Sequence, residues 1–133
     1  MNENRIREFA MSYASAWCSQ NASSVASFYS PNGSLTINGG ATSIGRTAIA
    51  AAAQDFMTTF PDLTVNLDDV GFNDEQVIFR WTANGTNTGP GGTGNAVRFS
   101  GYEEWTLGSD GLIAASKGHF DAADYLRQLN APR

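Results

Sequence analysis

Apolar and polar residues alternate over residues 97–107, which is the clearest pattern in the chain. One of the two alternating series is apolar apart from a single acid, and its members are Val97, Phe99, Gly101, Glu103, Trp105 and Leu107. This period of two predicts a β-strand whose apolar series faces the core. A carboxylate on that face is costly unless it is paired, protonated or open to a cavity. We therefore interpret Glu103 either as the polar centre of a pocket or as a rim residue where the sheet reaches solvent.

Other segments repeat their apolar residues every three or four positions, which is the spacing of an amphipathic helix. This spacing predicts one helix over residues 3–19 and another over 46–59, the second ended by Pro61. A shorter helix is predicted over 22–29, where the turn sequence 31–33 ends it.

Four further segments alternate as strands do, and turn sequences rich in glycine, asparagine and aspartate separate them; they are residues 34–38, 63–68, 76–88 and 112–120. A short helix over 122–129, capped by Asp121, closes the chain. Helices that precede a run of antiparallel strands predict an α+β domain, in which the helices cover one face of a curved sheet. Such a sheet leaves a cone with aromatic walls, which is typical of a small-molecule site.

The composition argues against several classes of function. The chain has 133 residues, a net charge of −5 and one lysine, Lys117, so we expect no nucleic-acid partner and no anionic membrane partner. One cysteine and one histidine offer neither a disulfide framework nor a zinc site, and we expect no metal and no cofactor. No apolar run approaches the roughly 20 residues of a membrane span, and the amino terminus does not read as a signal peptide. We therefore expect a single soluble domain in the cytoplasm.

Four short stretches carry a resemblance to a known family: Phe60-Pro61-Asp62-Leu63, Arg80-Trp81-Thr82 with residues 84–89, Asp110-Gly111-Leu112-Ile113, and Asp121 with residues 126–129. Together with the order of elements, they make almost the whole chain resemble the SnoaL-like polyketide cyclase group of the nuclear transport factor 2-like, or ketosteroid isomerase-like, superfamily. The resemblance implies one SnoaL-like domain over residues 1–133. It also implies a cone-shaped α+β barrel, with a curved mixed or antiparallel sheet wrapped around about three amino-terminal helices, a short carboxy-terminal helix, and a homodimer formed through the outer sheet face.

The resemblance gives two residues a possible role in catalysis. Tyr13 falls where a ketosteroid isomerase-like helix places its hydrogen-bonding tyrosine, and Glu103 falls where that group keeps a protonated acid. Such a pair would bind an oxyanion. The general base of the isomerases would fall near Ile37 and Asn38, and neither of these can take up a proton. Proton shuttling by that route is therefore not expected.

Other positions depart from the patterns of the family. Arg80 resembles the pocket arginine of limonene epoxide hydrolase-like relatives, but Thr82 and Gly118 stand where aspartates of the hydrolases or cyclases would be. Asn87 replaces a histidine of the cyclases. Epoxide hydrolysis is therefore not expected, and Glu103 is left as the most plausible acid or base of the cavity.

The expected site combines these residues with aromatic side chains. The catalytic candidates are Glu103, Arg80 and Tyr13, and an ion pair between Arg80 and Glu103 would be either catalytic or purely structural. The candidates for substrate contacts are Trp17, Phe56, Phe60, Thr82, Phe99, Trp105 and Phe120. On the opposite face of the sheet we expect His119, and an apolar dimer surface made of Val77, Phe79, Trp81 and Tyr102.

Two functions remain open at the level of sequence. The first is a cofactor-independent isomerase-, cyclase- or lyase-like enzyme that transfers a proton on a compact apolar molecule with one carbonyl or carboxylate. In it, Glu103 is the acid or base, and Arg80 and Tyr13 stabilise negative charge. The second is a non-catalytic ligand-binding or dimerisation module of the same fold, favoured by the missing base at Ile37 and the missing aspartate at Gly118.

Overall fold

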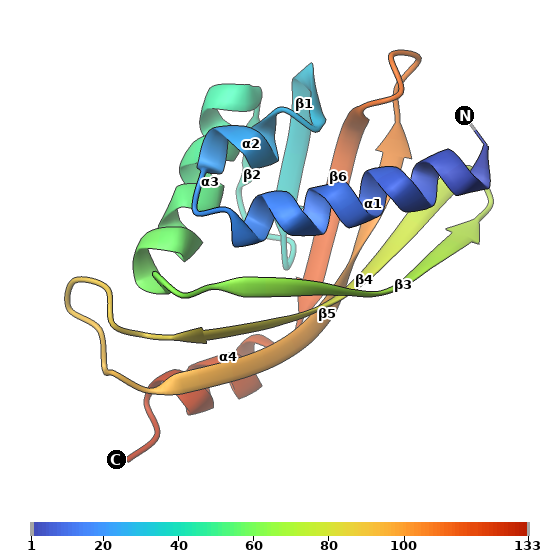
Figure 1. Cartoon of the computed structure of the whole chain (residues 1–133). Coiled ribbons are helices and arrows are strands. Elements are labelled where there is room, and N and C mark those ends of the chain that lie inside the picture. Colours follow the sequence, from blue (N-terminus) through green and yellow to red (C-terminus); the bar gives the residue numbers. More distant parts are fainter. Residues whose placement is uncertain (1, 133) are drawn as a thin grey trace.

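The computed structural model describes residues 2–132, in which the three amino-terminal helices lie together on one side of a single curved sheet (Figure 1). The helices are α1 (Glu3–Cys18), α2 (Ala22–Ala26), α3 (Arg46–Thr59) and α4 (Ala122–Leu129). The strands are β1 (Tyr29–Ile37), β2 (Thr42–Ile44), β3 (Thr64–Asn73), β4 (Gln76–Thr86), β5 (Ala96–Leu107) and β6 (Ile113–Phe120). No helix within residues 2–132 is both long and apolar enough to cross a bilayer.

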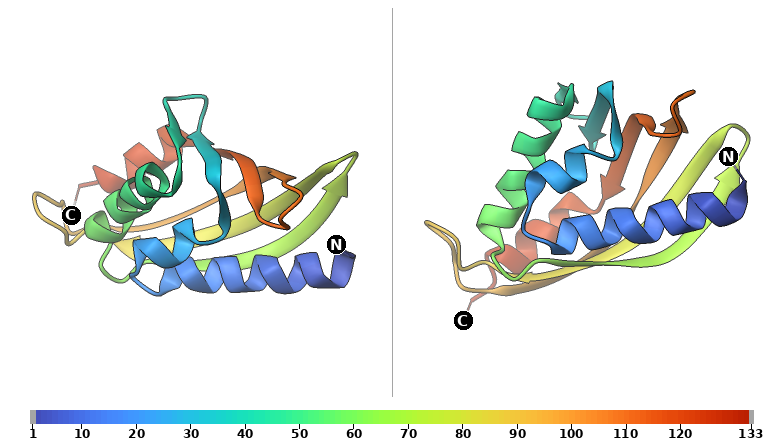
Figure 2. Two further views of the ribbon diagram at one scale, coloured as in Figure 1. Left: turned by 90° about the horizontal axis from the view of Figure 1, so that it is seen from above. Right: turned by 45° about the horizontal axis from the view of Figure 1, so that its top comes forward.

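The sheet is mixed and open. Its strand order is β2-β1-β6-β5-β4-β3, and every neighbouring pair is antiparallel except β1 and β6, which run parallel. The sheet bends around α1, α2 and α3 without pairing its two edge strands, as both views of Figure 2 show. The expected α+β class with a curved mixed sheet is therefore confirmed, although the sheet is not closed into a barrel.

The long helices form where the three- and four-residue spacing predicts them. In α1, the side chain of Asn2 caps the helix by accepting a hydrogen bond from the Arg5 amide at 2.9 Å, and one face of the helix is buried against the sheet. Helix α3 starts after Gly45, whose φ of 87° suits glycine, and it ends before Pro61. These two helices place Trp17 and Phe56 against each other, with ring centroids 6.1 Å apart.

The segment after α2 differs from the sequence prediction. Helix α2 ends at Ala26, and the chain enters β1 at Tyr29, where a helix end and a turn were expected. Tyr29 pairs with Ile113 of β6, and the Ile113 amide donates to the Phe28 carbonyl at 2.9 Å. Because this pairing joins segments far apart in the sequence, local periodicity does not reveal it.

The inner and outer faces of β4 are the reverse of those expected. Phe79 pairs directly with Glu103, so both side chains lie on the inner face, and Trp81 follows on that face two residues later. Arg80 lies on the outer face and is exposed; its guanidinium sits 5.4 Å from the ring centroid of Tyr102. The expected position of Arg80 beside Glu103 is therefore wrong, as is that of Thr82 in the cavity.

The outer face of the sheet is more polar than expected. Val77, Phe79 and Trp81 all point inward, so only Tyr102 of the four expected surface residues lies outside. Tyr102 stacks on His119, with ring centroids 4.8 Å apart, and His119 Nε2 lies 2.8 Å from Glu104 Oε1. The expected apolar patch is thus wrong in composition, and a homodimer through this face stays a prediction.

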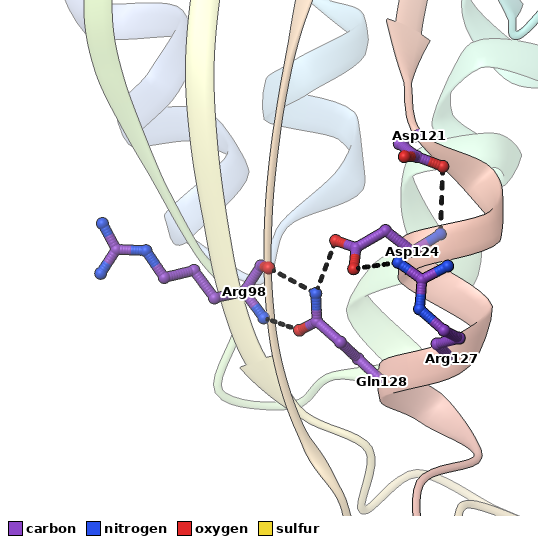
Figure 3. Close-up of polar contacts among 5 residues, drawn as sticks. All are labelled: Arg98, Asp121, Asp124, Arg127 and Gln128. Carbon is purple, nitrogen blue, oxygen red and sulfur yellow. Dashed lines mark hydrogen bonds and ion pairs between the residues drawn. The ribbon is translucent and has the colours of Figure 1, made fainter.

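Helix α4 covers one end of the sheet (Figure 3). Asp121 accepts a hydrogen bond from the Asp124 amide at 3.0 Å, which is the expected cap. The side-chain amide of Gln128 accepts from the Arg98 amide at 2.6 Å and donates to the Arg98 carbonyl at 2.8 Å. Gln128 thereby satisfies the backbone N–H and C=O groups of Arg98, which lies beyond Gly101, the last residue of β5 that pairs with β6.

Candidate functional site

A cavity of about 60 Å³ lies between the inner face of the sheet and the helices. Trp17 of α1 and Phe56 of α3 line it from the helical side. The sheet contributes the side chains of β4 and β5 that alternate inward, among them Trp81, Phe99 and Glu103. The other lining residues within the described chain are apolar, so Glu103 is the single ionisable group on the wall.

Glu103 occupies the middle of β5 and is 7% exposed. Its Oε1 atom accepts hydrogen bonds from Trp105 Nε1 at 2.8 Å, Ser116 Oγ at 2.9 Å and the Tyr13 hydroxyl at 3.0 Å. Its Oε2 atom has one longer contact, 3.3 Å from the same Tyr13 hydroxyl. The two oxygens are therefore unequal: Oε1 is held by three donors, and Oε2 retains capacity for a ligand.

A second tyrosine extends this network. The hydroxyls of Tyr13 and Tyr29 lie 2.8 Å apart, and both rings are fully buried. Since Tyr13 has one proton to donate to Glu103, its oxygen is free to accept the proton of Tyr29. Burial is the largest cause that raises the pKa of each hydroxyl well above 10.0, so both tyrosines remain neutral donors.

Burial also raises the pKa of Glu103 above its usual value of 4.5, and the hydrogen bonds from Trp105, Ser116 and Tyr13 partly oppose this shift. No lysine, arginine or histidine among residues 2–132 lies within 4.0 Å of this carboxyl. Desolvation without a compensating cation favours the protonated acid. Glu103 is thus a carboxyl that neutral donors hold in place and that an apolar cavity surrounds.

Five of the ten expected site residues line the cavity: Glu103, Trp17, Phe56, Phe99 and Phe120. Tyr13 lies behind the acid and reaches the site through its hydrogen bond to Glu103. Trp105 is fully buried and reaches the site only through its hydrogen bond to Glu103. Phe60 is buried elsewhere and packs on Tyr125 of α4, with ring centroids 6.2 Å apart.

Arg80 and Thr82 lie outside the site, on the far face of the sheet. The hydroxyl of Thr82 donates to Asp68 Oδ2 at 2.5 Å and lies 2.8 Å from Ser100 Oγ. Because Thr82 and Ser100 form a cross-strand pair, and side chains alternate along each strand, neither reaches the face that carries Glu103. Oxyanion stabilisation by Arg80 is therefore not available.

Sequence reasoning missed several residues of the site. Ser116 donates to Glu103 because β6 pairs with β5, and Tyr29 joins because β1 lies beside β6. These contacts depend on strand order, for which the sequence carries no local signal. Phe79 and Trp81 had a signal: they belong to the apolar alternation of β4, which by itself predicts an inward face.

The free energy of unfolding is expected to fall as the pH rises through the pKa of folded Glu103. The folded protein holds this proton to a higher pH than the unfolded chain, whose Glu103 titrates near 4.5. Between the two values the folded state binds more protons, so rising pH favours unfolding. The contribution of Glu103 to the free energy of unfolding is fully present below about pH 4.5 and is lost once the pH exceeds the pKa of folded Glu103. Urea unfolding at several values between about pH 4 and pH 8 measures this slope.

The variant Glu103→Gln isolates the contribution of this residue, because it removes the titration and keeps the shape of the side chain. The variant should lose the decline in stability, whereas Glu104→Gln on the outer face of the same strand should keep it. Equal pH dependence in the wild type and Glu103→Gln would contradict the assigned shift.

Comparison with known proteins identifies the fold and the family. A SnoaL-like domain model matches residues 10–116. No curated protein matches the chain. TsrD from Streptomyces laurentii superposes with a TM-score of 0.83 at 19% identity, covering 99% of each chain. A hypothetical protein with a ketosteroid isomerase-like fold from Catenulispora acidiphila, in complex with trimethylamine, gives 0.82 at 16% identity, covering 94% of each chain.

A further similar structure is that of SalBIII, described as an epoxide hydrolase/cyclase-like enzyme in pyran ring formation in polyether salinomycin. It gives a TM-score of 0.79 at 16% identity, covering 92% of this chain and 95% of the other. At these identities the structures show a shared fold, whereas the domain model covers most of the sequence. The chain belongs to the SnoaL-like domain family.

Proposed function

We propose that the protein binds a compact, mostly apolar organic molecule with one carbonyl or carboxyl group, and that Glu103 exchanges a proton with it. The observation that carries this proposal is a buried carboxyl on the wall of an otherwise apolar cavity, with no cation beside it. Such surroundings move the pKa of an acid toward the range in which general acids and bases operate.

The unequal oxygens of Glu103 support this role. Oε1 is occupied by its three donors, so a proton or a ligand atom has room only at Oε2. In the protonated acid, Oε2 would donate to a ligand oxygen. In the carboxylate, it would remove a proton from a carbon next to a carbonyl. The three donors stabilise the negative charge of Glu103 while it is a carboxylate, before it takes up that proton.

Tyr13 and Tyr29 support the same reaction from behind the acid. When Glu103 gives up its proton, the Tyr13 hydroxyl can strengthen its hydrogen bond, and the Tyr29 hydroxyl supports Tyr13 in turn. Neither tyrosine needs to ionise. Tyr13 is therefore a positioning residue for Glu103.

The cavity suits a small ligand. About 60 Å³ of space with walls such as Trp17, Phe56 and Phe99 favours an apolar body over a charged or extended one. The Catenulispora protein of the same fold was solved with trimethylamine, which is also a small molecule. SalBIII is described as acting in ring formation of a polyether.

A second candidate is a binding module without chemistry. It is favoured by the absence of a second ionisable group on the cavity wall within residues 2–132, because many proton transfers need both an acid and a base. Ile37 and Gly118 also line the cavity, and by the family resemblance they stand where relatives carry an acid. If the protein is such a binding module, we expect it to bind the ligand without exchanging a proton with it.

Deuterium exchange of cyclopentanone in heavy water separates the two candidates. We expect the wild-type protein to accelerate exchange of the hydrogens next to the carbonyl, and Glu103→Gln to reduce this acceleration by about 100-fold or more. NMR spectroscopy follows the loss of the proton signal. The matched control is Glu104→Gln, whose carboxylate lies on the opposite face of β5 and should retain full exchange.

Exchange that persists in folded Glu103→Gln would rule out Glu103 as the acid or base. Binding of cyclopentanone without exchange by the wild type would support the binding module. If the wild type showed no binding of cyclopentanone and no exchange, this result would contradict a carbonyl compound as the ligand. Thermal unfolding of each variant checks that the fold is retained.

A further inference from the structure

A side chain is missing from the inner face of the sheet directly beside Glu103, at Gly118 of β6. Gly118 pairs with Glu103 of β5 on one side and with Ile37 of β1 on the other. Residues in register on neighbouring strands share a face of the sheet, so these three positions form one row across the inner face. All three line the cavity, and between the side chains of Ile37 and Glu103 the row offers only backbone.

The space over Gly118 belongs to the cavity. Gly118 is buried, and a Cβ built on it would have Glu103 Cγ as its nearest contact, at 3.7 Å. The next contacts would be the Thr36 carbonyl oxygen at 3.8 Å and Ile37 Cγ1 at 3.9 Å. These are ordinary van der Waals distances, so a side chain would fit here. In its absence, a ligand group can lie directly over the Gly118 Cα.

Neither crowding nor backbone conformation requires a glycine at this position. The glycines of β4 and β5 are crowded: a Cβ at Gly85 would lie 2.8 Å from Phe60 Cβ, and one at Gly101 would press on the backbone of β6. Gly118 has no such contact, and it is not among the glycines with positive φ. A glycine inside a strand weakens the strand, and it often marks a place where a ligand comes close to the backbone.

The surroundings of this gap favour an alkyl group. Glu103 and Ile37 each present a carbon atom to it, and the Thr36 oxygen belongs to the backbone of β1, which pairs with β6. Burial of an alkyl group against such atoms is favourable, whereas an unpaired polar group would be costly there. The carboxyl of Glu103 ends the side chain that borders the gap. An alkyl group in the gap would therefore lie next to the ligand group that Glu103 contacts.

We propose that Gly118 is a specificity-determining residue of the cavity, and that the gap over it takes an alkyl substituent on the carbon next to the carbonyl of the ligand. This inference rests on the proposed function and narrows its ligand class. The preferred ligand is branched beside its carbonyl, as a 2-alkyl cyclic ketone is. An unbranched ligand leaves the gap empty and loses the contacts there.

The test compares racemic 2-methylcyclopentanone with cyclopentanone, which differ by one methyl group. We expect the wild type to bind the methyl compound about fourfold more tightly, which is the gain for one buried methyl group. Gly118→Ala fills the gap with a methyl group of the protein. It should shift the ratio of the two dissociation constants by about tenfold in favour of cyclopentanone. Isothermal titration calorimetry measures both constants.

Gly71→Ala is the matched control. Gly71 pairs with Ile78, the neighbour of the inward Phe79 in the chain, so it lies on the outer face of the sheet. A Cβ there would meet Ile78 Cβ at 3.6 Å, an ordinary contact like those at Gly118. This variant should keep the wild-type ratio of dissociation constants. Thermal unfolding checks that both variants are folded.

NMR spectroscopy gives a second measurement, which needs no variant in the bound sample. The Hα signals of Gly118, identified by their loss in Gly118→Ala, should show nuclear Overhauser effects to the methyl group of bound 2-methylcyclopentanone. An equal ratio of dissociation constants in the wild type and Gly118→Ala, or no Overhauser effect at saturation, would overturn the inference.

The outcome for Gly118 is separate from that for proton transfer. A shifted ratio in Gly118→Ala together with no deuterium exchange by the wild type would keep the role of Gly118 and reject the catalytic role of Glu103. Exchange that depends on Glu103 together with an unchanged ratio would do the reverse. If the wild type bound neither ketone, this result would reject both.

Discussion

Replacement of Trp105 by alanine is expected to lower the free energy of unfolding by about 4 kcal/mol, because it opens a cavity in the middle of the core. Trp105 is fully buried and stacks on Phe79, with ring centroids 5.0 Å apart and an angle of 17°. Its edge contacts Phe9 and Tyr13, at 5.7 and 5.2 Å. The substitution also removes one of the three donors to Glu103.

Urea unfolding followed by circular dichroism measures this loss, since removal of a tryptophan changes the fluorescence signal itself. Trp105→Phe is the matched control: it keeps an aromatic ring and should cost about 1–2 kcal/mol for the lost hydrogen bond. A loss below about 2 kcal/mol for Trp105→Ala would mean that the surrounding rings collapse into the space.

Gly101→Ala is the second substitution with a large expected effect, a loss of about 3 kcal/mol or more. A Cβ at this position would press on the His119 carbonyl oxygen, which belongs to the backbone of β6 and cannot rotate away. It would also lie 2.7 Å from Trp81 Cζ2 and 3.0 Å from Phe120 Cβ. Strands β5 and β6 would have to separate, or the indole would have to leave its place in the wall.

Gly118→Ala tests whether this effect is specific to the position. Gly118 is also a glycine in the sheet, and it pairs with Glu103. A Cβ there would find ordinary contacts, the nearest being Glu103 Cγ at 3.7 Å. This variant should stay within about 1 kcal/mol of the wild type and should narrow the cavity. Thermal unfolding of both variants checks the difference, and equal losses would contradict the crowding assigned to Gly101.

The elements of the fold could be predicted well because their signals are local. The alternation in 97–107 predicted both the strand β5 and the inward direction of Glu103, which the buried carboxyl bears out. The spacing of apolar residues predicted α1 and α3 almost to the residue. Strand β2 was missed, because three residues paired at a sheet edge carry too short a pattern.

The surroundings of Glu103 could be predicted only in part. Tyr13 was expected near it by resemblance, and the two groups lie 3.0 Å apart. The face of β4 was assigned by resemblance to epoxide hydrolases, although the alternation of Val77, Phe79 and Trp81 indicates an inward apolar face. The apolar pattern was the better guide there, because burial acts on every side chain, whereas a motif can change its role within a family. The dimer and the cytoplasmic location stay predictions.

The parallel pairing of β1 with β6 affects how the protein folds during its synthesis on the ribosome. Leu35 pairs with Ser43 of the short strand β2, which is made soon after it, but its partner on the other side, Ser116 of β6, is made much later. Until then the sheet is incomplete, and the apolar side chains of α1, α2 and α3 are exposed to solvent and to other molecules. Folding of this chain is therefore expected to be completed after synthesis, and its slowest step is expected to be the pairing of β1 with β6.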